Sequence, residues 1–129
     1  MRIFKNKPFA RFSRKNGIAD QELCDSIEDA NRGLISADLG GGVIKQRIAR
    51  QGSGKSGGFR TLILFRVAER AIFVHGFAKN EAENIRPDEL VALKKLATEM
   101  LAYNQAGLKA AMESGTLMEV QCNDKRETV

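Results

Sequence analysis

The sequence predicts an α+β fold in which helices flank a small antiparallel sheet, within one domain of residues 1–129. Two patterns predict it. Acidic segments carry apolar residues at helical spacing, and basic segments are alternating or β-branched and aromatic, as strands are. The length agrees, because 129 residues can bury one core and leave no room for a large second domain.

Two helices are expected, both in acidic segments. The first helix is expected to begin at the acidic residues Asp20 and Glu22 and to end at Gly33. The second starts at Pro87, a residue favoured in a first turn, and reaches Tyr103 or, past a break at Gly107, Met112. Their apolar positions are Leu23, Ile27, Ala30 and Leu34 in the first and Leu90, Leu93, Ala97, Met100 and Leu101 in the second.

Strands are expected in the remaining segments. The predicted strands are residues 8–14, 43–50, 59–66, 71–78 and a short late one at 117–121. Residues 67–70 are short enough to join the two long strands as a hairpin. This order segregates the helices from one basic face of the sheet, and the chain is expected to fray from Asp124 onward.

The charge of the chain is divided into blocks that follow these elements. The net charge is +5. Residues 1–17 contain six basic side chains and no acid, and residues 43–80 contain eight against Glu69. Residues 18–42 and 81–129 carry net charges of −5 and −3. The basic blocks predict either a phosphate-binding surface or a solvated face whose long side chains cover apolar area.

Several classes of protein and site are excluded at this stage. No apolar run approaches the roughly 20 residues of a membrane span, and the basic N-terminus lacks the apolar core of a secretory signal. Cys24 and Cys122 lie 98 residues apart without metal-type spacing, which argues against a disulfide scaffold or a zinc site. We therefore expect a cytoplasmic protein with no metal and no cofactor.

A near match to a nucleotide-binding loop is also rejected. Residues 49–56 read A-R-Q-G-S-G-K-S, with Ala49 where the phosphate-binding loop requires glycine. That loop works only when a helix follows it, and here two glycines and a predicted strand follow.

Alternation along the strands places basic side chains on common faces. Lys45 and Arg47 share one face of their strand, and Arg60 shares a face with Leu62 and Leu64. The third strand is predicted to place Phe73, His75, Phe77 and Lys79 together. A glycine-dense loop that contains Lys55 connects the first two strands. If these faces coincide, the strands form one cationic surface.

The same segments resemble the RelE/HigB-like toxins of bacterial type II toxin–antitoxin systems. The resemblance is carried by G-V-I-K-Q-R-I-A-R, by G-S-G-K-S-G-G-F-R-T-L-I-L-F-R and by A-I-F-V-H-G-F-A-K-N-E, and it covers roughly residues 9–120. It implies the small microbial-ribonuclease-type fold of that family. It also implies ribosome-dependent cleavage of mRNA and a cognate antitoxin as inhibiting partner.

The resemblance also implies roles for single residues. Lys45 and Arg47 match the paired basic residues before the glycine loop, and Arg60 matches the central arginine after it. Lys79 matches the basic residue after the last core strand, and His75 falls where some relatives place a general acid or base. Neighbouring cations assigned to RNA binding are Arg50, Lys55 and Arg66.

This sequence departs from the family near the chain end. Where several relatives use a tyrosine or a second arginine, it offers Asn80, and its only tyrosine is Tyr103. The general acid and base therefore stay open between His75 and a lysine whose pKa neighbouring cations depress.

Three functions remain open. The first is the endoribonuclease toxin. The second is a gyrase-inhibiting toxin of the related ParE branch, and the third is a non-catalytic, nucleic-acid-binding relative. Codon preference, oligomeric state and the antitoxin-binding surface cannot be read from the sequence.

Overall fold

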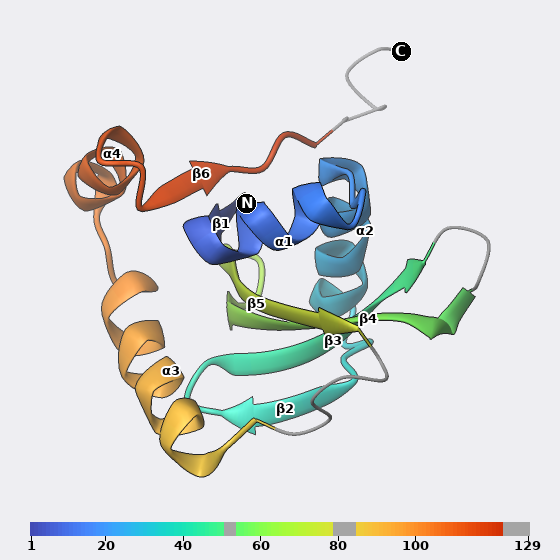
Figure 1. Ribbon diagram of the computed structural model, residues 1–129. Helices are drawn as coiled ribbons and strands as arrows, with labels where there is room; N and C mark the ends of the chain where they lie inside the picture. The colour runs from blue at the N-terminus through green and yellow to red at the C-terminus, as the bar shows by residue number, and fades with distance from the viewer. Residues whose placement is uncertain (51–53, 79–84, 123–129) are drawn as a thin grey trace.

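The computed structural model describes residues 1–50, 54–78 and 85–122, which form six strands and four helices (Figure 1). The strands are β1 (Arg2–Asn6), β2 (Ala37–Gly40), β3 (Val43–Arg50), β4 (Gly54–Arg66), β5 (Arg70–Ala78) and β6 (Leu117–Glu119). The helices are α1 (Lys7–Lys15), α2 (Asp20–Asn31), α3 (Pro87–Met100) and α4 (Gln105–Glu113). The sheet order is β2-β3-β4-β5-β1-β6, and only β1 and β5 pair in parallel. The predicted α+β class is confirmed.

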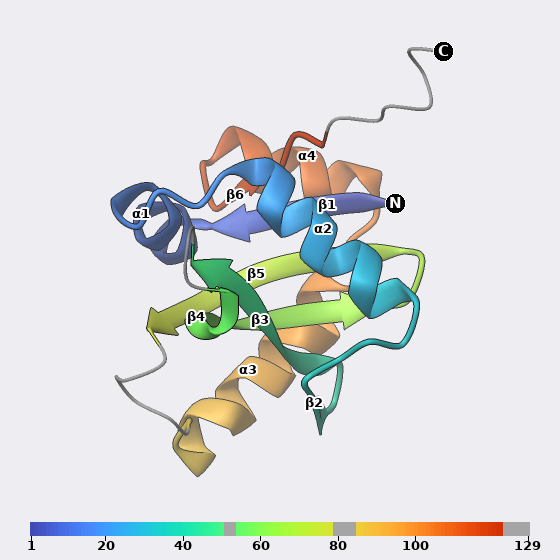
Figure 2. The ribbon, with the colours of Figure 1, turned by 90° about the vertical axis from the view of Figure 1, so that its right-hand side faces the viewer.

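Different helices cover the two faces of the sheet (Figures 1 and 2). Side chains of α1 and α2, among them Phe9 and Ile27, pack against Ile63 and Phe73 on one face. On the other face, the end of α3 and α4 pack against an apolar cluster from the central strands. Both faces thus contain a core, so the predicted segregation of the helices from one face of the sheet is wrong: α3 and α4 pack on the second face as well.

Residues 8–14, predicted as a strand, are instead most of helix α1. The Asn6 side chain accepts a hydrogen bond from Phe9 N at 2.9 Å and so caps the helix, while Pro8 occupies the first turn. Phe9, Ala10 and Ser13 are buried at helical spacing, which the alternation of apolar and polar residues had concealed. The preceding strand β1 and the short edge strand β2 were not predicted.

The predicted second helix is two helices in the structure. Helix α3 ends at Met100, and Asn104 caps α4 by accepting a hydrogen bond from Gly107 N at 2.8 Å. The break therefore lies before Gly107. At the end of α2, Gly33 has φ of +85°, as its predicted role as a stop requires, and Leu34 lies outside the helix with 60% exposure.

The two cysteines form a disulfide, which the sequence analysis had argued against. Cys24 of α2 is bonded to Cys122, just after β6. The pairing arises because β6 lies beside β1, where Val120 N donates to Ile3 O at 2.8 Å. Asp20, at the start of α2, also accepts a hydrogen bond from Gln121 N at 2.8 Å and one from Lys5 Nζ at 2.9 Å. The C-terminal segment is thus joined to α2 covalently and by hydrogen bonds.

These contacts make the stability depend on acid. Burial raises the pKa of Asp20, but the hydrogen bonds from Gln121 and Lys5 and the charge of Lys5 outweigh it and hold that pKa below its ordinary value. A carboxylate with a depressed pKa stabilises the fold fully above its unfolded pKa, about 3.9, and loses this as pH falls through the lower folded value.

We therefore expect Asp20→Asn to lower the free energy of unfolding by about 1–2 kcal/mol at neutral pH. The difference from the wild type should shrink in acid, as denaturant titrations from pH 7 to pH 3 would reveal. Glu28→Gln, on an exposed position of the same helix, is the control and should change little. Equal losses at every pH would mean that the charge of Asp20 is not the cause.

Candidate phosphate-binding site

The basic residues of β3 and β4 lie on the sheet face that α3 and α4 partly cover. The strand register arranges this face in rows across β3, β4 and β5. From the apolar end these rows are Val43–Leu64–Ile72, Lys45–Leu62–His75 and Arg47–Arg60–Phe77. The face therefore changes from apolar to basic over three rows. The strand register places Lys45, Arg47 and Arg60 on one face of the sheet, as predicted.

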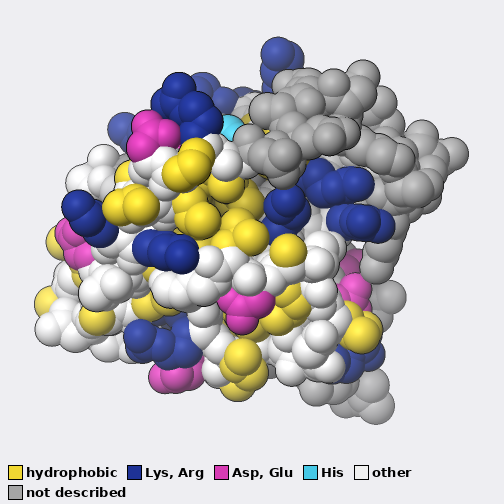
Figure 3. All heavy atoms as spheres, turned by 90° about the horizontal axis from the view of Figure 1, so that it is seen from below, with side chains coloured by type: hydrophobic (Ala, Val, Ile, Leu, Met, Phe, Trp, Pro, Cys, Tyr) yellow, Lys and Arg dark blue, Asp and Glu magenta, His cyan; other side chains and the backbone are white. Residues whose placement is uncertain are grey.

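Arg47 and His75 at the basic end of this face are exposed in the described structure, whereas α3 packs against the apolar end. Ala97 and Met100, both in the last turn of α3, are its buried residues, and they belong to the cluster of Val43 and Ile72. Figure 3 shows lysine and arginine side chains and the single histidine bordering an apolar surface. We call the group Lys45, Arg47, Arg60 and His75 the basic face.

One guanidinium nitrogen of Arg60 is buried and unsatisfied among the described residues. Its side chain is half-buried, and its Nη1 atom is buried without a hydrogen-bond partner among the described residues. Arg47 stands directly opposite on β3, a pairing of like charges that destabilises a sheet. A buried donor left unpaired costs about 1–3 kcal/mol, and more when it is charged. Such an atom calls for an explanation, and a bound anion supplies one.

Several other arginines of the chain form ion pairs with carboxylates. These pairs are Arg2 with Glu119, Arg32 with Asp29, Arg66 with Glu69 and Arg86 with Asp88 and Glu89. In contrast, within residues 1–50, 54–78 and 85–122, no carboxylate pairs with Lys45, Arg47 or Arg60. Among the described residues, the positive charge of these three side chains is thus not neutralised by a carboxylate.

A β-bulge places His75 on the basic face. Leu62 pairs with His75 and the next residue, Ile63, pairs with Phe73, so that Val74 is an extra residue in β5. The predicted grouping of Phe73 with His75 and Phe77 is therefore wrong for Phe73, which is buried on the opposite face. His75 is exposed, with its ring centroid 5.7 Å from that of Phe77.

Gly76 follows this bulge and permits the close approach of α1, and the sequence analysis did not single it out. A Cβ atom at this position would overlap the Phe12 ring of α1. Glycine inside a strand often marks a bulge or a close approach of another element, and both apply here. The glycine inside the predicted strand 71–78 was therefore the sequence signal from which the irregularity could have been predicted.

We expect Gly76→Ala to destabilise the protein by about 1–3 kcal/mol, the usual cost of overpacking. Thermal unfolding would measure it. Phe12→Leu combined with Gly76→Ala should recover part of the loss, because the smaller side chain makes room. If Gly76→Ala alone unfolds like the wild type, Phe12 moves aside freely and the contact does not fix the bulge.

The other predicted site residues do not join this group in the described structure. Arg66 lies at the opposite end of β4, where it donates to Leu101 O at the end of α3 at 3.0 Å. Arg50 and Lys55 belong by backbone to β3 and β4, but their side chains lie outside the described part of the chain. Lys79 lies outside the described residues altogether.

The remaining chemistry of the site is limited. The only tyrosine, Tyr103, packs against the apolar cluster near α3 and α4 and not on the basic face. Within the described residues, no group of three or more histidine, cysteine, aspartate or glutamate side chains could hold a metal ion. The searched portion of the chain also contains no helix with the length and apolar character to cross a membrane.

Fold and site together define a small α+β protein with a partly open cationic sheet face suited to binding phosphate. The family model of the RelE toxin of the RelE/RelB toxin–antitoxin system matches residues 1–120, and the chain belongs to this family. It is therefore a toxin of a toxin–antitoxin system, and its cognate partner is an antitoxin. A search of curated protein sequences finds no significant match.

Proposed function

We propose that this toxin is a ribosome-dependent endoribonuclease that cleaves mRNA without a metal ion and so inhibits translation. The buried, unpartnered Nη1 of Arg60, in the row it forms with Arg47, is the observation that carries the proposal. RNA cleavage creates a phosphorane with additional negative charge, and a preorganised cation is most useful where such charge develops.

The reaction needs three contributions from the protein. The 2′-oxygen of a ribose attacks the adjacent 3′-phosphorus, the bond from phosphorus to the 5′-oxygen breaks, and a 2′,3′-cyclic phosphate forms. One group must accept the 2′-proton, cations must stabilise the phosphorane, and the leaving 5′-oxygen must receive a proton.

Arg60 is assigned to the phosphorane, because a guanidinium can donate to two phosphate oxygens at once. Arg47 lies in the same row of the sheet as Arg60, and Lys45 lies in the adjacent row, that of His75. Both add positive charge beside Arg60. Proton transfer is assigned to His75, which is exposed on the same face and is the single histidine of the sequence. Lys79, Lys55 and Arg50 are retained as RNA-binding or catalytic candidates from the sequence.

Expression of the wild-type chain in a bacterial host, with primer extension on a reporter mRNA, tests the proposal. The expected result is growth arrest accompanied by cuts confined to translated regions, and by no cuts in the same transcript lacking a start codon. Growth arrest with intact mRNA would overturn the proposal in favour of a gyrase-inhibiting toxin. Soluble protein without any arrest would favour a non-catalytic relative.

A further inference from the structure

The outer face of α1 is a second concentration of positive charge that the proposed reaction does not use. Lys7, Arg11, Arg14 and Lys15 recur at helical spacing, and all four side chains are exposed. The helix contains no acid, and the first carboxylate of the chain is Asp20. The buried side of the same helix carries Phe9 and Ala10. The helix is thus apolar inward and purely basic outward.

These four cations have no counter-ion in the described structure. Nearby, Lys5 forms an ion pair with Asp20, and Arg2 forms one with Glu119. No such pair involves the outward side chains of α1. Arg14 and Lys15 lie in the last turn, where they complement the helix dipole, but Lys7 and Arg11 do not. Dipole compensation alone therefore does not account for the face.

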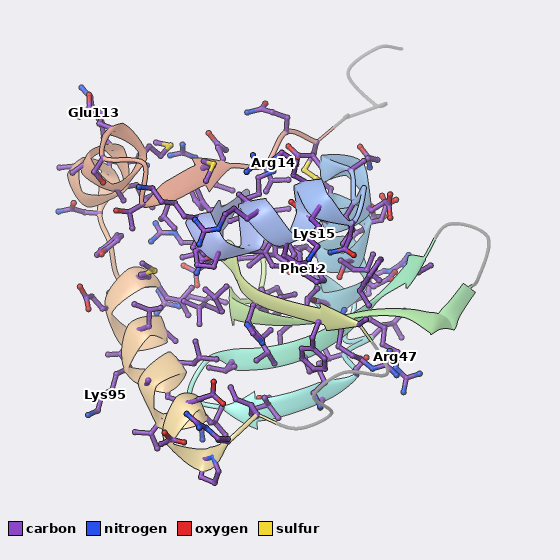
Figure 4. All side chains as sticks on the ribbon, viewed as in Figure 1. Phe12, Arg14, Lys15, Arg47, Lys95 and Glu113 are labelled. Atoms are coloured by element: carbon purple, nitrogen blue, oxygen red, sulfur yellow. A yellow bond between two sulfur atoms is a disulfide. The ribbon has the colours of Figure 1, made fainter. Side chains whose placement is uncertain are left out.

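The position of α1 connects it to the basic face. Strand β1 pairs with β5 only as far as Phe73, and beyond that point α1 takes its place beside β5. Asn6 Nδ2 donates a hydrogen bond to Val74 O at 3.2 Å. The Phe12 ring lies against Gly76, the residue of β5 that stands between His75 and Phe77 in the sequence. Helix α1 is thus anchored at the bulge that presents His75. Figure 4 labels Arg14 and Lys15 on α1 and Arg47 on β3.

We propose that the outer face of α1 binds the phosphate backbone of RNA, as a docking surface separate from the basic face. The proposal rests on the proposed function, because it concerns the RNA that this toxin acts on. Arginine and lysine side chains along an exposed helix contact phosphates without reading sequence. A membrane surface is disfavoured because apolar side chains at the membrane-facing border of such a helix would be needed, and those of α1 point into the core.

Paired double variants test this surface. Arg11→Gln/Lys15→Gln removes two charges from α1, while Lys95→Gln/Lys109→Gln removes two from exposed positions of α3 and α4. Glutamine keeps helix propensity, so both variants are expected to fold. Binding would be measured by fluorescence anisotropy with a 2′-O-methyl RNA strand, which cannot be cleaved, over a series of salt concentrations. Binding to the purified cognate antitoxin would be measured in parallel.

The α1 variant is expected to bind RNA more weakly, with the slope of log K against log[salt] reduced by about 1.4 for two lost contacts to a single strand. The control should keep the wild-type slope. An α1 variant with the wild-type slope and affinity would overturn the inference. So would an α1 variant that binds RNA normally but loses antitoxin binding, since the face would then belong to the protein partner.

This outcome is separable from that of the proposed function. Arg60→Ala should keep the contribution of α1 to the salt slope whether or not the wild type cleaves mRNA. If the wild type binds RNA through α1 but cuts no mRNA, the inference about α1 holds and the proposed function is wrong. If the wild type cuts mRNA but the α1 variant binds RNA like the wild type, the proposed function holds and the inference about α1 is wrong.

Discussion

Arg60→Ala is expected to lower the rate of mRNA cleavage by about 100- to 1,000-fold, the usual cost of removing one preorganised donor to a transition-state oxyanion. The same substitution should leave the free energy of unfolding unchanged or raise it. The reason is that the Nη1 atom of Arg60 is buried without a hydrogen-bond partner among the described residues, and that the like charge of Arg47 lies opposite. Single-turnover cleavage of ribosome-bound mRNA and denaturant unfolding would measure the two effects.

Two further variants sharpen this result. Arg60→Lys keeps the charge but loses the planar pair of donors, so it should recover only part of the rate. Arg32→Ala, which removes an exposed arginine paired with Asp29, is the control and should cleave like the wild type. If Arg60→Ala cleaves normally but unfolds more easily, Arg60 has a structural role and the site must be sought elsewhere.

Much of the fold could be predicted because the patterns that encode it are local. Strand β3 occupies the predicted residues 43–50, and α2 carries its apolar stripe where the spacing placed it. Helix α1 was missed because Phe9 and Phe12 among basic residues resemble a strand. Recognising Asn6 as a cap and Pro8 as a first-turn residue would have corrected the assignment.

Part of the basic face could be predicted from the sequence, but the strand register that brings its residues together could not. Alternation alone put Lys45 and Arg47 on one face, and the position of Arg60 followed from the motif. That Arg60 stands opposite Arg47 depends on how the strands pair, and that His75 joins them depends on an inserted Val74. A bulge shifts the alternation of every residue after it, so no periodicity argument could place Phe73 and His75 on different faces.

The disulfide could not be predicted for a similar reason. Cys24 and Cys122 meet only because β6 returns to pair with β1 beside α2, and this is a property of the whole topology. The spacing of two cysteines in the sequence carries no information about such a long-range contact.

Removing the disulfide is the second change for which we expect a large effect. A cross-link between residues 98 positions apart restricts the unfolded chain strongly, and the chain-entropy estimate for a loop of this length is about 4–5 kcal/mol. Cys24→Ala/Cys122→Ala should therefore lower the melting temperature by about 10 °C or more. A dithiol reductant should lower the melting temperature of the wild type similarly, because it reduces the disulfide to two thiols and is itself oxidised to a disulfide. The double variant should not respond to the reductant.

The site should survive this loss of stability. The rows of the basic face are held by the hydrogen-bonded pairing of β3, β4 and β5, to which neither cysteine belongs. Reduction should therefore increase amide exchange first around β6, which retains the Arg2–Glu119 pair but loses its covalent bond to α2. Cleavage at a temperature below both transitions should continue. If cleavage stops on reduction while β3 to β5 stay protected, the disulfide must act on the site through β1 and α1, the elements that lie between β6 and the bulge of β5.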